Sequence, residues 1–243
     1  MMNPTLCIIG GCNGAGKTTL ARALLPRMGL MRFLNADEIA RGISPLDPTL
    51  TAFKAGRLLI EEARSLLKAK ASFAIESTLS GRTYVAMIRK AQALGYRFVL
   101  HYIRIDSAAQ AVSRVALRVK IGGHHVPEED VVRRFTRSRQ HFLADYLPLA
   151  DEWGLWENAV PPSRCIASSA THTREQVAEM LNSHTLMETA PVNPSPMVEM
   201  VLEASRVATV KMLDYYKRMG IKVTPQMTLA PERKKRVKKS EKK

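Results

Sequence analysis

Eight residues near the N-terminus have the types and the spacing of a phosphate-binding loop. They run from Gly11 to Thr18 and match the pattern G-x-x-x-x-G-K-[ST]. Glycine has no Cβ, so the backbone can take positive φ and bring several N–H groups close to a polyphosphate. The lysine places a cation on the β- and γ-phosphates, and the threonine hydroxyl is a ligand for Mg²⁺. We therefore predict nucleotide contacts from Gly11, Asn13, Gly14, Ala15, Gly16, Lys17, Thr18 and Thr19, with Thr18 also at the metal.

The segments on either side of this loop give it the context that the motif requires. Residues 5–10 form an apolar run typical of a buried strand, and residues 19–25 favour a helix that stops near Pro26. The helix adds the positive end of its dipole to the anion site. The chain has no N-K-x-D motif of the kind that reads guanine, so we expect ATP with Mg²⁺.

Two carboxylates follow predicted strands further along the chain. Asp37 comes after a strand predicted at 31–34, and Glu76 comes after one predicted at 72–75. Open α/β sheets bind ligands at the carboxyl ends of their strands, so we expect both carboxylates to face the γ-phosphate. A carboxylate there can accept a proton from an attacking hydroxyl or hold Mg²⁺. The alternative is that one residue caps a helix and the other binds Mg²⁺ through water.

Arginines are concentrated between residues 104 and 139. Arg114 and Arg118 are four residues apart, so they share a helix face, and the same holds for Arg133 and Arg137. On a mobile lid, arginines neutralise the charge that develops on a phosphoryl group during transfer. The alternative is a solvated basic surface. The full set is Arg104, Arg114, Arg118, Arg133, Arg134, Arg137 and Arg139.

Strand and helix patterns alternate along most of the chain. Further strands are predicted at 97–103, 152–157 and 164–167 from runs of β-branched and aromatic residues. Further helices are predicted at 49–70, 84–94, 127–146 and 173–181, and from the cap at Asp106-Ser107 to about residue 119. Such alternation is typical of a parallel sheet with helices on both faces.

Composition places the protein among globular chains with anionic partners. The 243 residues are 46% hydrophobic, and 37 Lys and Arg against 22 Asp and Glu give a net charge of +15. Such a balance favours nucleotides, and it favours nucleic acid through the basic C-terminal end. No apolar run is long enough to span a bilayer, so no membrane partner is expected. Cys7, Cys12 and Cys165 lack metal spacing and indicate reduced thiols in a cytoplasmic protein.

Proline and charge patterns divide the chain. We predict a nucleotide-binding domain over 1–185, a proline-containing linker over 186–197, a C-terminal helix over 198–220 and a basic, disordered tail over 221–243. The helix carries an apolar stripe at i, i+3, i+4 and i+7 spacing, which is typical of a docking face.

Four motifs together resemble the zeta-toxin-like P-loop kinases, especially their bacterial chromosomal branch. They are the phosphate-binding loop, the segment Leu34–Ala40, the segment Glu76–Gly81 and the segment Gly122–Glu129. The resemblance covers about residues 5–170. It implies an α/β P-loop fold with a central parallel sheet, flanking helices and an arginine-rich helical lid. It also implies ATP-dependent phosphorylation of a small-molecule hydroxyl, with UDP-N-acetylglucosamine as the family acceptor and an antitoxin protein as a partner.

The resemblance also assigns roles by position. Lys17 and Thr18 correspond to the nucleotide and Mg²⁺ residues, Asp37 to the catalytic base, and Glu76 and Thr78 to substrate-holding residues. The first lid arginine corresponds to Arg114 or Arg118. The second falls near His124, where no arginine stands, and Arg134 or Arg133 is the expected substitute in nucleotide binding.

Other functions share parts of these motifs. A nucleoside or polynucleotide kinase would use the same loop and base. A nucleotide-dependent switch protein would instead use the basic tail to hold nucleic acid. An ABC-type ATPase is disfavoured, because Leu79–Arg82 comes too soon after the loop to be its signature motif and no apolar run ending in Asp-Glu follows it.

Overall fold

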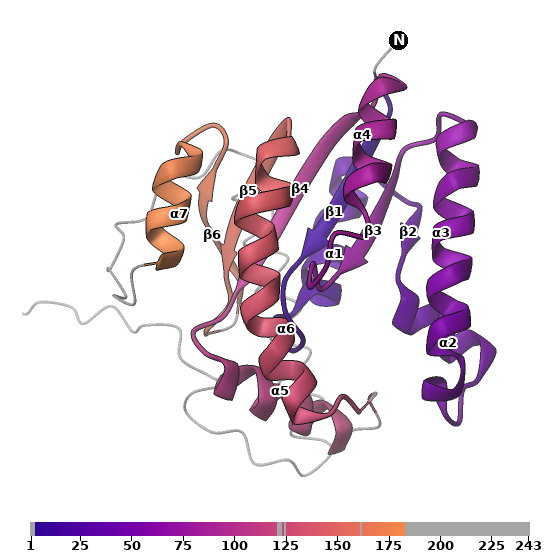
Figure 1. Ribbon diagram of the computed structural model, residues 1–243, viewed down its shortest axis with the longest axis vertical. Coiled ribbons are helices and arrows are strands. Elements are labelled where there is room, and N and C mark those ends of the chain that lie inside the picture. Colours follow the sequence, from indigo (N-terminus) through magenta and orange to yellow (C-terminus); the bar gives the residue numbers. More distant parts are fainter. Residues whose placement is uncertain (1–2, 121–122, 124, 161, 183–243) are drawn as a thin grey trace, which may run out of the picture.

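A six-stranded sheet organises the computed structural model, which describes residues 3–120, 123, 125–160 and 162–182 (Figure 1). The strands are β1 Thr5–Gly10, β2 Phe33–Leu34, β3 Phe73–Ser77, β4 Arg97–Arg104, β5 Glu152–Glu157 and β6 Arg164–Ser168. Their order across the sheet is β2-β3-β1-β4-β5-β6. All neighbours are parallel except β5 and β6, which are antiparallel. The predicted α/β fold with a central parallel sheet is thereby confirmed.

The antiparallel edge departs from a fully parallel sheet. Only the short loop 158–163 separates β5 from β6. A parallel crossover needs a dozen or more residues, usually including a helix, so this loop can only reverse the chain.

Helices cover both faces of the sheet, as the alternation predicted. They are α1 Lys17–Leu24, α2 Ala36–Ile43, α3 Ala52–Lys68, α4 Val85–Ala93, α5 Ala108–Lys120, α6 Glu128–His141 and α7 Arg174–Asn182. One core lies between the sheet and α3, α4 and α7, and it includes Phe142 just after α6. The other lies between the sheet and α1 and α5. Strand β1 is fully buried because it is central and its side chains enter both cores alternately.

Helix ends differ in detail from the predicted ones. The helix predicted over 127–146 is α6 up to His141, and a π-helical turn follows at Phe142–Tyr146. Pro148 comes next and has no N–H to continue the helical hydrogen bonds. The helix predicted from residue 49 opens with a 3₁₀ turn at Pro48–Thr51, because Asp47 caps that turn through the Thr49 amide.

Several predictions fall outside the described residues. These are the linker at 186–197, the helix at 198–220, the tail at 221–243 and the loop position His124. Within the part of the chain that the structure describes, no helix combines the length and the apolar character that crossing a membrane would need.

Candidate active site

The phosphate-binding loop connects β1 to α1 and depends on three glycines with positive φ. Gly11, Gly14 and Gly16 have φ of 145°, 75° and 91°. A Cβ on Gly11 would come within 2.6 Å of the Ile103 carbonyl oxygen, and one on Gly14 within 2.9 Å of the Ala111 oxygen. The loop therefore needs glycine for its backbone angles and for its close approach to β4 and α5.

The loop lysine is held at the mouth of this turn. Lys17 is 8% exposed, and its Nζ donates to the Cys12 carbonyl oxygen at 2.9 Å. The same Nζ lies 3.9 Å from Oε1 of Glu76. Its ammonium group is therefore stationed between the loop backbone and a carboxylate at the end of the neighbouring strand.

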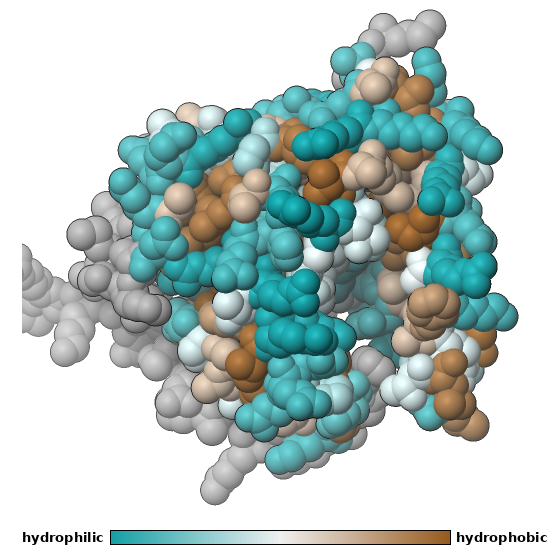
Figure 2. Space-filling view, in the orientation of Figure 1, coloured by the Kyte–Doolittle hydropathy of each residue, from teal (hydrophilic) through white to brown (hydrophobic). Residues whose placement is uncertain are grey.

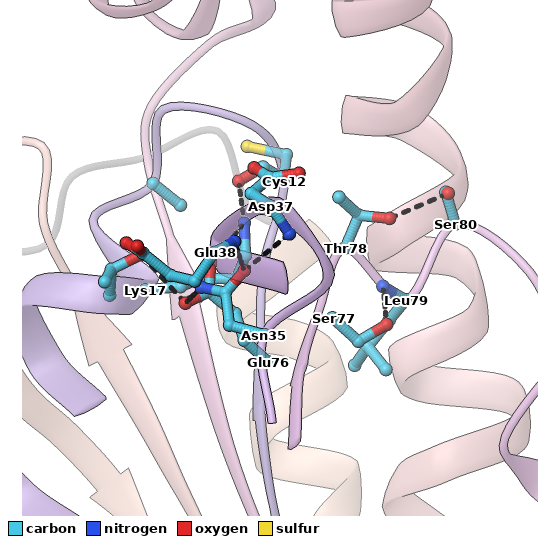
Figure 3. A network of polar contacts seen from close by, with 12 residues as sticks. Cys12, Lys17, Asn35, Asp37, Glu38, Glu76, Ser77, Thr78, Leu79 and Ser80 are labelled. Atoms are coloured by element: carbon cyan, nitrogen blue, oxygen red, sulfur yellow. Dashed lines mark hydrogen bonds and ion pairs between the residues drawn. The ribbon is translucent and has the colours of Figure 1, made fainter. Parts of the chain in front are cut away.

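Glu76 is the centre of the polar network in Figure 3. Its Oε2 accepts hydrogen bonds from Oγ1 of Thr18 and from Nδ2 of Asn35, both at 2.8 Å. Burial raises the pKa of Glu76, and the repulsion of Asp37 and Glu38 acts in the same direction. The charge of Lys17 and the hydrogen bond from Thr18 oppose that shift. Sequence reasoning expected Glu76 to face the γ-phosphate, and the family resemblance gave it a substrate-holding role; in the structure it accepts a hydrogen bond from Thr18 of the phosphate-binding loop.

Asp37 stands in the first turn of α2, beside Glu76 but without contact to it. Its side chain is exposed, and its backbone N–H donates to Oδ1 of Asn35 at 2.8 Å. Among the described residues, its carboxylate has no hydrogen bond and no ion pair. The two predicted carboxylates thus have different environments: Glu76, on β3, is 12% exposed and bonded to the loop, whereas Asp37 is open to solvent.

Thr78 follows the last residue of β3. The hydroxyl of Ser80 lies beside its own, and sequence reasoning did not assign Ser80 to the site. Oγ1 of Thr78 and Oγ of Ser80 are 2.9 Å apart. Between them, Leu79 has φ of +52° and a buried side chain. A positive φ is costly for a leucine, so the surrounding packing must stabilise this turn. The turn leaves two hydroxyls side by side at the edge of the sheet (Figure 3).

Of the predicted lid arginines, Arg114 contacts the phosphate-binding loop. Its Nη1 donates to the Gly14 oxygen at 3.4 Å and its Nη2 to the Ala159 oxygen at 2.8 Å. Arg118 follows one turn later on α5 and is half-buried. Arg134 forms an ion pair with Asp130 on its own helix at 3.3 Å.

The remaining arginines of the set divide between surface and structural positions. Arg133 pairs with Asp130 at 2.6 Å, and Arg137 is exposed. Arg104 pairs with Glu157 at 2.8 Å, which ties the ends of β4 and β5 together. Arg139 donates to Asn182 at 2.9 Å, so it joins α6 to α7.

Two asparagines at this site were missed from the sequence. Asn35 is 6% exposed and caps α2 while it contacts Glu76. An asparagine directly before a helix is a cap signal that the sequence does contain. Asn158, in the loop after β5, donates from Nδ2 to the Ala15 oxygen at 2.7 Å. No local sequence pattern predicts that contact, because 143 residues separate the partners.

The oxygen donors beside the loop fit a hard divalent cation. Mg²⁺ is bound in nucleotide sites by one or two protein oxygens together with phosphate oxygens and water. Thr18 and Glu76 supply a hydroxyl and a carboxylate that already touch at 2.8 Å. In the described ranges, no group of three or more His, Cys, Asp or Glu side chains forms a separate metal cluster.

Comparison with known proteins gives a family and a shared fold. Residues 6–142, more than half of the chain, match the family model of an AAA domain. A Haemophilus influenzae protein described only as uncharacterized is 34% identical over 125 residues, which are 51% of this chain and 88% of that protein.

Three solved structures have similar folds. One belongs to the PezAT chromosomal toxin–antitoxin system of Streptococcus pneumoniae, with a TM-score of 0.55, 15% identity and coverage of 88% of this chain and 89% of that one. A candidate kinase from Chloroflexus aurantiacus has a TM-score of 0.51 and 18% identity, over 76% and 100% of the two chains. The AvrRxo1-ORF1:-ORF2 complex with ATP has a TM-score of 0.57 and 17% identity, over 85% and 76%. These likenesses and the sheet order show a P-loop α/β fold, and the match over residues 6–142 shows that the chain belongs to the AAA domain family.

Proposed function

We propose that this protein is a kinase that transfers the γ-phosphoryl group of ATP to the hydroxyl of a small-molecule acceptor. The observation that carries the proposal is that two neighbouring carboxylates have different environments. Glu76 is bonded to Thr18 and lies near Lys17, on the nucleotide side. Asp37 is exposed, follows the neighbouring strand β2 at the same edge of the sheet, and has a carboxylate without a hydrogen bond or ion pair among the described residues. A nucleotide switch alone would not need this second carboxylate.

The nucleotide side follows from the loop contacts. Backbone N–H groups of residues 13–18 would surround the β-phosphate at the N-terminus of α1. Lys17 would exchange its Cys12 contact for the β- and γ-phosphates, because a phosphate oxygen is a stronger acceptor than a carbonyl. Thr18 and Glu76 would hold Mg²⁺, which supplies charge neutralisation at the γ-phosphate. Arg114 already lies on the loop and would neutralise charge from the α5 side.

The transfer step uses Asp37 as the base. Its carboxylate accepts the proton of the acceptor hydroxyl while that oxygen forms a bond to the γ-phosphorus. The bond between the γ-phosphorus and the bridging oxygen breaks, and ADP leaves with that oxygen. An exposed aspartate suits this role because an entering substrate can reach its carboxylate.

The acceptor that we favour is a sugar nucleotide such as UDP-N-acetylglucosamine. Support comes from the motif resemblance to zeta-toxin-like kinases and from the fold shared with the PezAT chain. The hydroxyls of Thr78 and Ser80 can donate to and accept from sugar hydroxyls. Figure 2 shows the surface hollowed between α6 and the α2–α3 pair, and Asp37 stands in the first turn of α2. The same likeness motivates the proposal of an antitoxin partner.

The test measures transfer from γ-labelled ATP to a panel of acceptors. The panel contains UDP-N-acetylglucosamine, free sugars, nucleosides and an oligonucleotide with a 5′-hydroxyl. We expect Asp37→Asn to keep ATP affinity and to lose transfer by about a hundredfold or more, since general-base catalysis contributes about 10²–10⁴.

Glu38→Gln is the matched control for that variant. Glu38 is the adjacent exposed carboxylate, and it pairs with Arg22 and Arg41 on the surface. Its loss should leave transfer nearly unchanged. Label found only in free phosphate, with every acceptor unlabelled, would contradict the kinase proposal. Equal turnover by Asp37→Asn and the wild type would contradict the assignment of the base.

A further inference from the structure

We propose that Asn35 is a positioning residue that sets the distance between the carboxylate on the metal side, Glu76, and the catalytic base, Asp37. The inference rests on the proposed function, because it concerns the same site. One buried side-chain amide connects the two groups. Its Oδ1 accepts from the backbone N–H of Asp37 at 2.8 Å and of Glu38 at 3.3 Å. Its Nδ2 donates to Oε2 of Glu76 at 2.8 Å (Figure 3).

Few backbone hydrogen bonds join β2, the strand that leads into Asn35 and Asp37, to the rest of the sheet. Strand β2 is the outermost strand and has only two residues, which pair as Phe33 with Ala74 and Leu34 with Ile75. The next pair in that register would be Asn35 with Glu76. Backbone pairing stops there, and the side-chain hydrogen bond continues the connection between the strands. Helix α2 also packs on the core through Ala36 and Ile39, and the amide of Asn35 is the side-chain link that ties its first turn to Glu76.

The chemistry requires an amide rather than another capping residue. Asp, Ser and Asn all cap helices well. Aspartate could accept from the helix N–H groups, but it has no proton to donate to Glu76. It would also add a negative charge beside Glu76, Asp37 and Glu38, which already repel one another. Serine is too short to reach Glu76 from the cap. Only an amide at this position serves both partners without adding charge.

The test compares Asn35→Ser, Asn35→Asp and Asn35→Ala in the full chain. Asp47→Ser is the control, because Asp47 caps a neighbouring turn by the same kind of bond, Oδ1 to the Thr49 amide at 3.0 Å. Measured quantities are kcat, the KM for ATP, the Mg²⁺ concentration for half-maximal rate and the melting temperature. The Mg²⁺ requirement is the readout that a merely structural cap would not change.

We expect Asn35→Ser to keep the helix cap and to melt above Asn35→Ala, but to lose about tenfold or more in kcat, the scale of one hydrogen bond to a charged group. Its Mg²⁺ requirement should rise, with little change in the KM for ATP. Asn35→Ala should lose melting temperature as well, since the cap is gone. Asn35→Asp should lose kcat and raise the Mg²⁺ requirement at least as much as Asn35→Ser, because it cannot donate to Glu76 and places a second negative charge beside it. Asp47→Ser should keep the wild-type kcat and Mg²⁺ requirement.

Two results would overturn the inference. One is a wild-type kcat and Mg²⁺ requirement in Asn35→Ser. The other is a loss of kcat that follows the melting temperature across all three variants.

Failure of the proposed function is a separate outcome. If the wild type transfers label to no acceptor, the role of Asn35 is tested by measuring ATP affinity with and without Mg²⁺. A gain in affinity from Mg²⁺ that shrinks in Asn35→Ser supports the connection to Glu76, and an undiminished gain overturns it.

Discussion

The side chain of Leu79 lies directly against Gly10, the last residue of β1 before the phosphate-binding loop. A Cβ built on Gly10 would overlap Cδ1 of Leu79 and come within 3.0 Å of its Cγ. Leu79 is 1% exposed and has φ of +52°. The turn that presents Thr78 and Ser80 is thus packed onto the strand that presents the nucleotide loop. The contact between Leu79 and Gly10 thus connects the proposed acceptor side of the site with the nucleotide side.

This contact predicts that Gly10→Ala destabilises the protein. The added methyl has no space, and we expect a loss of about 1–3 kcal/mol in the free energy of unfolding, as for other overpacked cores. Urea titration measures it. Gly56→Ala is the control, because a Cβ there meets nothing within 4 Å in the middle of α3. That change should add about 0.5–1 kcal/mol instead, and equal effects of the two would contradict the packing account.

Lys17→Ala should abolish useful nucleotide binding. The ammonium group is the only side-chain cation of the loop motif itself, and charge-assisted contacts to phosphate are about twice as strong as neutral ones. We expect the Kd for ATP to rise by about a hundredfold, or about 3 kcal/mol. Lys54→Ala, at an exposed position at the start of α3, should bind ATP like the wild type. A fluorescence titration that finds unchanged affinity in Lys17→Ala would exclude the loop as the nucleotide site.

Asn158→Ala should weaken ATP binding through the shape of the loop. Its hydrogen bond to the Ala15 oxygen is worth about 1 kcal/mol, so the Kd should rise about fivefold. Gln92→Ala removes a bond of the same type, from Nε2 to the Leu149 oxygen at 2.9 Å, at a position far from the loop in the sequence. Both variants should lose similar stability, but only Asn158→Ala should lose affinity. Calorimetric titration separates them, and parallel losses of affinity would argue against a specific role for Asn158.

His101 should make the protein less stable in mild acid. Nε2 of this residue is inaccessible to solvent and has no partner among the described residues, and its Nδ1 accepts from Nε1 of Trp156 at 3.2 Å. Burial lowers the pKa of His101 from 6.5 to about 4. The unfolded chain therefore binds the proton first as the pH falls. This contribution is fully present above pH 6.5 and is lost between 6.5 and about 4, by at most about 3 kcal/mol.

The control for this pH dependence is His101→Phe, which keeps an aromatic ring without an ionisable nitrogen. Unfolding free energies at several pH values between 7.5 and 4.5 give the difference between the two proteins. The wild type should fall relative to the variant as the pH is lowered, whereas parallel curves would mean that His101 titrates normally. Taking the difference removes the contributions of Glu76 and Glu157, whose pKa values burial raises in both proteins.

Local patterns in the sequence predicted the elements and the loop. The spacing Gly11–Thr18, the apolar run before it and the alternation of later elements depend on neighbours within a few residues, so the α/β sheet could be read directly. Asp37 follows β2 as predicted, in the first turn of α2, whereas Glu76 was predicted to follow a strand and lies within β3, next to its last residue. Strand β6 was predicted, but its antiparallel direction was not, because strand periodicity carries no information on direction.

Contacts between distant parts of the chain were decided only by the tertiary structure. Glu76 meets Thr18 across 58 residues and Asn158 meets Ala15 across 143, so no local spacing could reveal either pair. The positive φ of Leu79 likewise follows from packing against Gly10, since leucine has no preference for that conformation. The sequence by itself determined which chemical groups are present and on which element each one stands. Folding determined which of them touch, because hydrogen bonds and packing act through space and not along the chain.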